Sequence, residues 1–374
     1  MKEFFLHVRQ SRKGGKSGGK EMKQLPIPVP ILKKPYEAPF LPRNICEDRF
    51  DPEHCQRAAP GIERLISNSY RSIVLSEESK KKILDLVTSS ILYASLHKSH
   101  LDHIVICGKM LLEGLPCPRT IGGSNLLTGI IGRSVKQFTG IDMMKWGAVP
   151  LKRGPSVSHE LPYTCTQIEA FLGSNKPVLV FPEIESSVNG NGKSIRTGRA
   201  YSEKIRKFAS SLFSPAINVS KKGDKVYIVP IAVSYDFVAE DNYFVRLAKA
   251  ANIKKSENPL VFFAGKLYYT FLESHFFYNL YNLGRGNIYI DIGQPILVEP
   301  NASKKELAES AYTAAAKSYR ITMPALVSYA ISRGATTKDE LKKSVERYAM
   351  ILKETKANFH TTLGLDKSVE VALQ

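Results

Sequence analysis

Several features are scarce in this sequence of 374 residues, and each scarcity excludes a class of protein. No run of about 18 consecutive apolar residues exists, which excludes an obvious membrane-spanning helix. The first residues become basic before any apolar stretch develops, so we expect no secretory signal. Cysteines are few and form no CxxC pair; they are Cys46, Cys55, Cys107, Cys117 and Cys165. We therefore expect reduced thiols in an intracellular protein and no disulfide framework.

Acidic residues are outnumbered by basic ones, 35 against 53, which gives a formal net charge of +18. Such a surplus of positive charge attracts an anionic partner. Composition alone does not decide whether that partner is nucleic acid, anionic lipid or a phosphorylated substrate. Residues 1–36 hold nine Lys and Arg against two Glu, and their Gly-rich and Pro-rich stretches disfavour a packed fold. We expect a basic flexible leader, or a tether to an anionic membrane surface, where each basic residue adds about 1 kcal/mol.

From residue 60 onward the apolar pattern alternates between helix-like and strand-like periods. Strands are expected at 91–96, 148–153, 177–183, 225–236 and 287–296, and helices at 77–88, 103–115, 161–173 and 201–212. Strands separated by helix-length segments predict an α/β domain over residues 60–300 with a mostly parallel central sheet flanked by helices. Residues 301–374 are expected to be a helical segment, because Ser303 with Glu306 and Thr337 with Glu340 have capping-box spacing.

The densest cluster of polar chemistry follows the first predicted strand and reads HKSHLDH, residues 97–103. Functional groups in open α/β sheets gather at the carboxyl ends of strands. His97 can act as a general base near neutral pH, and Asp102, on the first helical turn, can fold back to orient its ring. Two other interpretations compete: a metal site that also uses His100 and His103, and solvated polar residues that cap a helix.

The cluster resembles the His-x4-Asp motif of the glycerolipid acyltransferases, and HKSHLD is closest to the membrane glycerol-3-phosphate and dihydroxyacetone-phosphate acyltransferases. Further blocks follow in the family's order: GAVPLKR at 147–153, FPE at 181–183, VPI at 229–231, GNIYIDIGQPILV at 286–298 and RITMPALVSYAI at 320–331. The resemblance covers about residues 85–332, so the α/β domain is expected to be a single acyltransferase domain.

The third block departs from the family, which usually reads FPEGTRS where this chain has FPEIESS at 181–187. The missing arginine puts the phosphate contact of that block in doubt. Lys193, Arg196 or Arg199, in the KSIRTGR stretch that follows, would have to supply it. The sequence GNGKS, residues 190–194, overlaps the start of this stretch, but Ser187 stands where a P-loop needs its first glycine, so we exclude a nucleotide-binding loop.

The resemblance implies acyl transfer from acyl-CoA or acyl carrier protein to the sn-1 hydroxyl of glycerol-3-phosphate, with no cofactor and no metal. His97 would take the hydroxyl proton and Asp102 would hold the imidazole, without a covalent acyl-enzyme. Arg153, which can bind phosphate in a bidentate manner, is the first candidate for the acceptor's phosphate. The other substrate-binding candidates are Lys152, Gly147, Glu183, Lys193, Arg196 and Arg199. Backbone amides after His97 are expected to stabilise the oxyanion.

Other functions stay open. The acceptor is alternatively lysophosphatidate or dihydroxyacetone phosphate. From another class, the charge of +18 permits a non-catalytic basic protein that binds membrane or RNA, although no RNA-recognition signature supports nucleic acid as a partner. The histidine cluster also permits a metal-dependent hydrolase. An aromatic-rich stretch at 260–283 is interpreted either as core or as a lipid-facing patch, and we expect peripheral association with the cytoplasmic face of a membrane.

Overall fold

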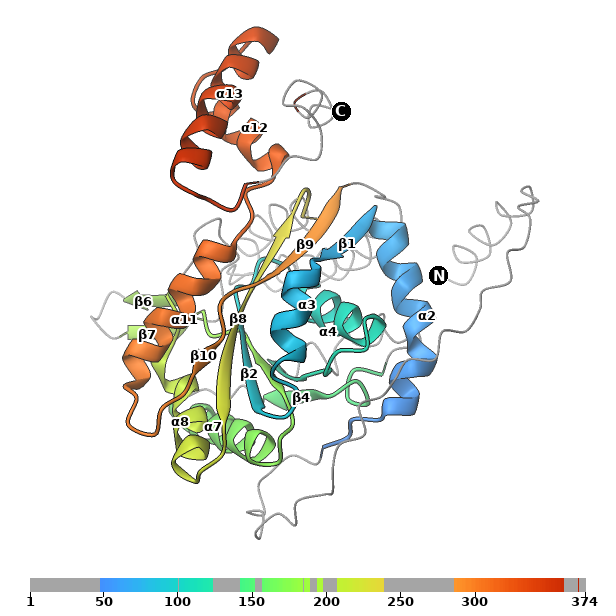
Figure 1. Cartoon of the computed structure of the whole chain (residues 1–374), viewed down its shortest axis with the longest axis vertical. Helices are drawn as coiled ribbons and strands as arrows, with labels where there is room; N and C mark the ends of the chain where they lie inside the picture. The colour runs from blue at the N-terminus through green and yellow to red at the C-terminus, as the bar shows by residue number, and fades with distance from the viewer. Residues whose placement is uncertain are drawn as a thin grey trace, which may run out of the picture.

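The computed structural model of the chain describes residues 48–99, 101–123, 142–151, 157–183, 185–188, 194–197, 207–238 and 286–359, together with residue 369. These ranges form a three-layer α/β/α unit and a pair of helices beyond the end of its sheet (Figure 1). The predicted fold class, α/β with a mostly parallel sheet and a helical C-terminal segment, is confirmed. The division at residues 36, 60 and 300 stays a prediction, and the basic leader lies outside the described residues.

The central sheet has eight strands among the described residues, seven of them in the order β1-β9-β8-β2-β5-β3-β4, with β10 paired to β8. Their bounds are β1 (Ser72–Leu75), β2 (Ser90–Ser95), β3 (Arg119–Gly123), β4 (Ala148–Leu151), β5 (Val178–Val180), β8 (Val226–Tyr235), β9 (Asn287–Ile292) and β10 (Ile296–Leu297). The strands β8, β2, β5, β3 and β4 run parallel, while β9 and β10 are antiparallel to β8. The carboxyl ends of five strands therefore meet at one edge.

Helices cover both faces of this sheet (Figure 1). The two sets are α2 (Pro52–Ser69), α3 (Glu77–Leu84) and α4 (Asp102–Leu112) on one face, and α7 (Val157–Gly173), α8 (Ser214–Lys221) and α11 (Lys304–Ser318) on the other. The side chains of β2 alternate between the two layers: Ile91 and Tyr93 join the first core, and Leu92 and Ala94 join the second. A strand buried on both faces explains why ILYA, residues 91–94 at the centre of β2, shows no alternation of apolar and polar residues.

Beyond the sheet, α12 (Met323–Ser332) and α13 (Lys338–Glu354) pack on each other around a small core of their own. The predicted capping box at Thr337 is present: its hydroxyl accepts from the Glu340 amide, and the Glu340 carboxylate accepts from the Thr337 amide. Ser303 caps α11 in a similar way, since its hydroxyl accepts from the Glu306 amide.

Two stretches differ from the predicted elements. The helix expected at 201–212 is wrong over residues 207–209, which are not helical, and Phe208 forms a β-bridge with Glu183. A 3-10 turn (Ser210–Phe213) follows, and α8 begins at Ser214 because Pro215 favours the first turn of a helix. The stretch after β5, for which the sequence predicted no strand, contributes an antiparallel pair, β6 (Glu185–Val188) with β7 (Ser194–Thr197).

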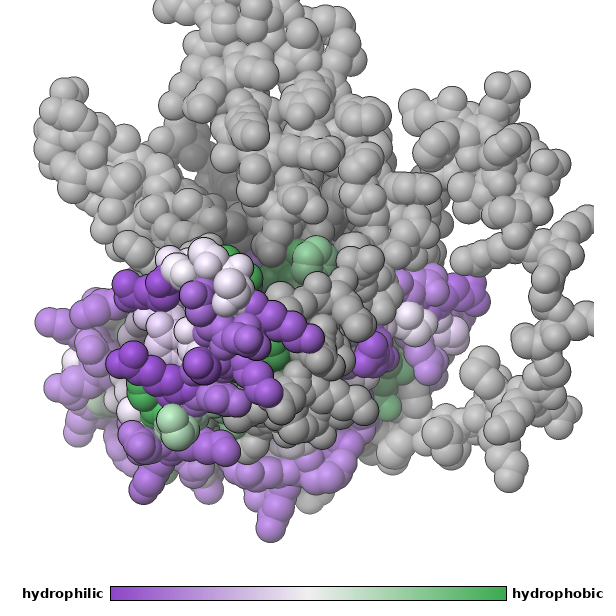
Figure 2. All heavy atoms as spheres, turned by 90° about the horizontal axis from the view of Figure 1, so that it is seen from above, coloured by the Kyte–Doolittle hydropathy of each residue, from purple (hydrophilic) through white to green (hydrophobic). Residues whose placement is uncertain are grey.

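The surface of the described part is mainly hydrophilic when it is seen from above, and apolar side chains show there only in small separate patches (Figure 2). Among the described residues, no helix combines the length and the apolar character that crossing a bilayer requires.

Candidate active site

The candidate site lies where β2 ends, between the carboxyl ends of its parallel neighbours β5 and β8. His97 follows the last residue of β2 by two positions, and α4 begins at Asp102. The chain turns sharply between them, which brings the two side chains back to the same point above the strand end. Both side chains are buried, and Asp102 is fully enclosed.

The imidazole of His97 is paired with this buried carboxylate. Nδ1 of His97 lies 2.5 Å from Oδ2 of Asp102. An ionised carboxylate only accepts hydrogen bonds, so the proton on this side of the ring belongs to Nδ1. Nε2 is then the nitrogen with the lone pair, and the adjacent negative charge stabilises the imidazolium that forms when Nε2 takes a proton.

Asp102 is held by donors on both oxygens. Oδ2 also accepts from the backbone amides of Lys98 at 2.7 Å and Ser99 at 3.0 Å, and Oδ1 accepts from the hydroxyl of Tyr235. Burial raises the pKa of Asp102 to about 6, while the hydrogen bonds from Ser99, Tyr235 and Lys98 act in the opposite direction. The carboxylate is therefore fixed in position, but its charge depends on these donors.

The His97 ring is supported from β5 by the FPE block. Phe181 stacks on the imidazole, with ring centroids 4.2 Å apart and planes inclined by 26°. Oε2 of the buried Glu183 accepts from the backbone amide of His97 at 3.3 Å. Phe181 thus restricts the tilt of the ring, and Glu183 restrains the backbone that carries it.

Two of these neighbours were given no role at the site from the sequence: Tyr235 was not singled out, and Phe181 was quoted only as part of the FPE block. Both lie at or just beyond the carboxyl end of a strand adjacent to β2, Tyr235 on β8 and Phe181 after β5. The only sequence signal for each of them is an aromatic residue at the end of an apolar run. That signal identifies a neighbour of His97 only once the sheet order shows that β8 and β5 lie on either side of β2.

The expected oxyanion site after His97 is not supported by the described amides. The amides of Lys98 and Ser99 donate to Asp102, that of Leu101 donates to the Ser99 hydroxyl, and that of Asp102 donates to the Ser99 carbonyl. These donors hold the turn that returns Asp102 to His97, so they are committed inside the protein. His100 lies outside the described residues.

The other predicted site residues are not brought to His97 by the described structure. Gly147 precedes β4, at the amino edge of the sheet, with a φ of 93°. An added Cβ would lie 3.1 Å from Phe50, so this position favours glycine for a backbone reason. Arg196 lies in β7, where only its backbone is described, and Lys152, Arg153, Lys193 and Arg199 lie outside the described residues, as does the aromatic stretch 260–283.

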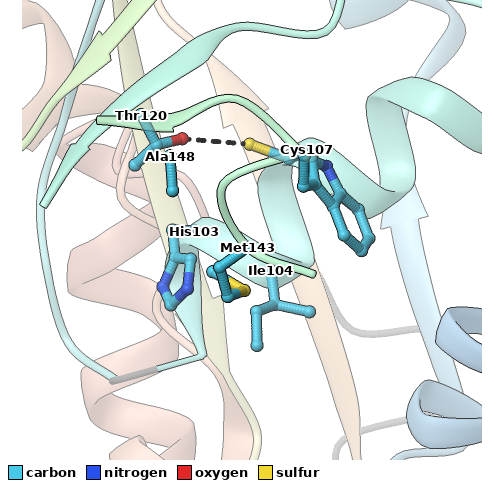
Figure 3. Close-up of a pocket in the computed structure, with 7 residues that line it drawn as sticks. His103, Ile104, Cys107, Thr120, Met143 and Ala148 are labelled. Carbon is cyan, nitrogen blue, oxygen red and sulfur yellow. Dashed lines mark hydrogen bonds between the residues drawn. The ribbon is translucent and has the colours of Figure 1, made fainter. Parts of the chain in front are cut away.

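A small pocket that is partly open to solvent lies beside the first turns of α4 (Figure 3). It is lined by His103, Ile104, Cys107, Thr120, Met143, Trp146 and Ala148. The lining is mostly apolar, and Cys107 Sγ lies 3.3 Å from Thr120 Oγ1 across it. As for the metal alternative, the described residues contain no group of three His, Cys, Asp or Glu side chains arranged to hold an ion.

Comparison with known proteins matches this region to one family. Residues 73–234 match the family described as Acyltransferase. The chain is 25% identical over 238 residues to the glycerol-3-phosphate acyltransferase of Alteromonas mediterranea, and the aligned region covers 63% of this chain and 25% of that protein. It is 27% identical over 236 residues to the same-named protein of Haemophilus influenzae, covering 61% and 24%. The chain thus spans about a quarter of the length of these curated relatives.

Proposed function

We propose that this chain, whose residues 73–234 match the family described as Acyltransferase, transfers a fatty acyl group from a thioester donor to the sn-1 hydroxyl of glycerol-3-phosphate. The donor is acyl-CoA or acyl carrier protein. The proposal of this acceptor follows the names of the relatives, while the chemistry follows the His97–Asp102 pair. That buried pair is the single observation that carries the mechanism.

His97 acts as the general base. The hydroxyl oxygen attacks the thioester carbonyl carbon, and its proton passes to Nε2 of His97. The tetrahedral intermediate then expels the sulfur, which takes the proton from Nε2 and leaves as the thiol. Base catalysis of this kind is worth about 10²–10⁴-fold, and it needs no covalent acyl-enzyme.

Asp102 orients the imidazole and stabilises the imidazolium during this cycle. Because its four hydrogen bonds come from the turn itself and from the end of β8, it needs no reorganisation when the proton arrives at His97. The sequence predicts Glu183 as a substrate-binding residue. Its bond to the His97 amide supports a role in holding the base.

The acceptor's phosphate is assigned to basic residues near the same edge. Arg153 and Lys152 follow β4, which ends at Leu151 and runs parallel to β3, β5 and β2. A residue that follows β4 therefore comes directly after a parallel strand that lies three strand spacings, each about 4.8 Å, from β2. Lys193, Arg196 and Arg199 are assigned to the same anion, in place of the arginine that the third block lacks.

We further propose that the chain works at an anionic membrane surface, which the net charge of +18 favours. Binding to anionic lipid vesicles, compared with vesicles of zwitterionic lipid alone, tests this. Equal binding to both kinds of vesicle would contradict it.

Release of free thiol from acyl-CoA and from acyl carrier protein tests the activity. Glycerol-3-phosphate should stimulate thiol release, and dihydroxyacetone phosphate and lysophosphatidate, assayed in parallel, identify the acceptor.

The variant His97→Ala should abolish the stimulated rate of thiol release. His54→Ala is the matched control, because that imidazole accepts the Asp142 amide on the amino side of β4. Full activity of His97→Ala would refute the mechanism, and binding to vesicles or RNA without thiol release would favour a non-catalytic protein.

A further inference from the structure

The hydroxyl of Tyr235 meets the oxygen of Asp102 that faces away from His97. We infer that Tyr235 is a positioning residue for the proposed reaction, which keeps the Asp102 carboxylate ionised and aimed at the imidazole. The inference rests on the proposed function. It adds a third member to the proton-handling group, one that lies 133 positions along the chain from Asp102.

Tyr235 is held firmly enough to play this part. It is the last residue of β8, is 7% exposed, and pairs through its backbone with Ile288 of β9. Its carbonyl accepts from the Thr322 hydroxyl at 3.2 Å, just before α12. The phenol ring also contacts the ring of Tyr70, the residue directly after α2, with centroids 6.0 Å apart. Contacts from several parts of the fold thus converge on this side chain.

The two oxygens of Asp102 divide their donors unequally. Oδ2 accepts from His97 and from the amides of Lys98 and Ser99, whereas the donor described at Oδ1 is the Tyr235 hydroxyl. Removing that hydroxyl therefore leaves Oδ1 of Asp102 without the hydrogen-bond donor described there. The geometry on the His97 side would be left in place, so the effect would fall on charge and not on folding of the turn.

The charged and titratable groups around the pair set the direction of the effect. Asp102 faces His97 and Tyr235, and the positive form of His103 on α4 also favours its ionised state. Glu183, after β5, meets the His97 amide. Burial disfavours the carboxylate, so its pKa is raised, and the Tyr235 hydroxyl opposes that rise. Without the hydroxyl, the proton that the pair shares at mildly acid pH would move from His97 to Asp102.

Tyr235→Phe is the variant that removes only this hydroxyl. Losing one hydrogen bond to the charged carboxylate should raise the pKa of Asp102 by roughly one to two units. The acid limb of kcat/KM should therefore move to higher pH by about half a unit to one unit, because the protonated carboxyl no longer supports the base. The rate should fall several-fold near pH 6 and much less near pH 8.5, with KM for the acceptor unchanged.

Tyr93→Phe is the matched control. Tyr93 lies on β2, four residues before His97, in the same core layer as Tyr235. It is fully buried, and among the described residues its hydroxyl has no hydrogen-bond partner. The pH profile of Tyr93→Phe should match that of the wild type. A uniform loss of rate at every pH in Tyr235→Phe, or an unshifted acid limb, would overturn the inference.

A second measurement separates this inference from the proposed function. The imidazolium signal of His97 can be followed by NMR as the pH is lowered, without any turnover. In Tyr235→Phe the signal should appear at lower pH than in the wild type and in Tyr93→Phe, because Asp102 takes the first proton. Absence of turnover in the wild type would refute the activity alone. An unchanged His97 titration in Tyr235→Phe would refute the role of Tyr235 alone.

Discussion

Replacing Asp102 with asparagine should change activity and stability in opposite directions. The amide is nearly isosteric, and its oxygen can accept from His97, Lys98 and Ser99 as Oδ2 does. Its NH2 group would then donate to the oxygen of Tyr235. The hydrogen bonds are thus largely kept, while the negative charge is lost.

The expected loss of activity follows from that charge. In the proposed mechanism, the carboxylate stabilises the imidazolium in the transition state through a charge-assisted hydrogen bond, which is worth about 1.5–3 kcal/mol. Since each 1.36 kcal/mol is about tenfold in rate, Asp102→Asn should lower kcat by roughly 10- to 100-fold. Thiol release at saturating donor and acceptor measures it.

The expected gain in stability follows from burial. The pKa of Asp102 is raised from 3.8 to about 6 in the folded protein, so its ionisation opposes folding by roughly 3 kcal/mol at neutral pH. A raised carboxyl pKa means that the folded state binds the proton more tightly. Stability from this group is therefore fully present below about pH 4 and is lost as the pH rises to about 6. Asp102→Asn should be more stable than the wild type near pH 7.5, with the difference vanishing near pH 4.

Thermal unfolding over this pH range is the assay, with Asp339→Asn as the control. Asp339 is exposed in the first turn of α13, so its replacement should change stability by no more than about 0.5 kcal/mol. An Asp102→Asn protein that unfolds at a lower temperature near pH 7.5, or that keeps full turnover, would refute this account of the pair.

Two further predictions concern the support of the site and the amino edge of the sheet. Phe181→Leu keeps apolar bulk but removes the flat face on His97, so kcat should fall about threefold to tenfold, with little change in KM, because a stacked pair is worth about 0.5–1.5 kcal/mol. Steady-state kinetics checks this, and an unchanged kcat would show that the ring needs no such support. Gly147→Ala places a Cβ 3.1 Å from Phe50 at a φ of 93°, so unfolding should require about 1–3 kcal/mol less. Denaturant unfolding measures this, and kcat of the folded protein should stay close to that of the wild type.

The sequence predicted the parts of this molecule that local patterns determine. The apolar run of β2, the caps of α11 and α13, and the nearness of His97 to Asp102 are all encoded within a few residues. Tyr235 and Phe181 approach the pair from neighbouring strands, and strand order is a property of the whole sheet. For the same physical reason, the antiparallel direction of β9 could not be anticipated. The commitment of the Lys98 and Ser99 amides to Asp102 required the turn to be known in three dimensions.

The region that matches the family ends at residue 234, one position before Tyr235. A fragment cut to that boundary would keep His97 and Asp102 but would lack the Tyr235 hydroxyl, which bonds to the other carboxylate oxygen of Asp102. It would also lose β9, which pairs with β8 on the side opposite β2. Two hydrogen bonds would go as well: the Arg320 amide donates to the Ser234 hydroxyl, and the Thr322 hydroxyl donates to the Tyr235 carbonyl. The smallest piece of this chain suited to testing the proposed activity therefore extends at least through Thr322, well past the end of the region that matches the family.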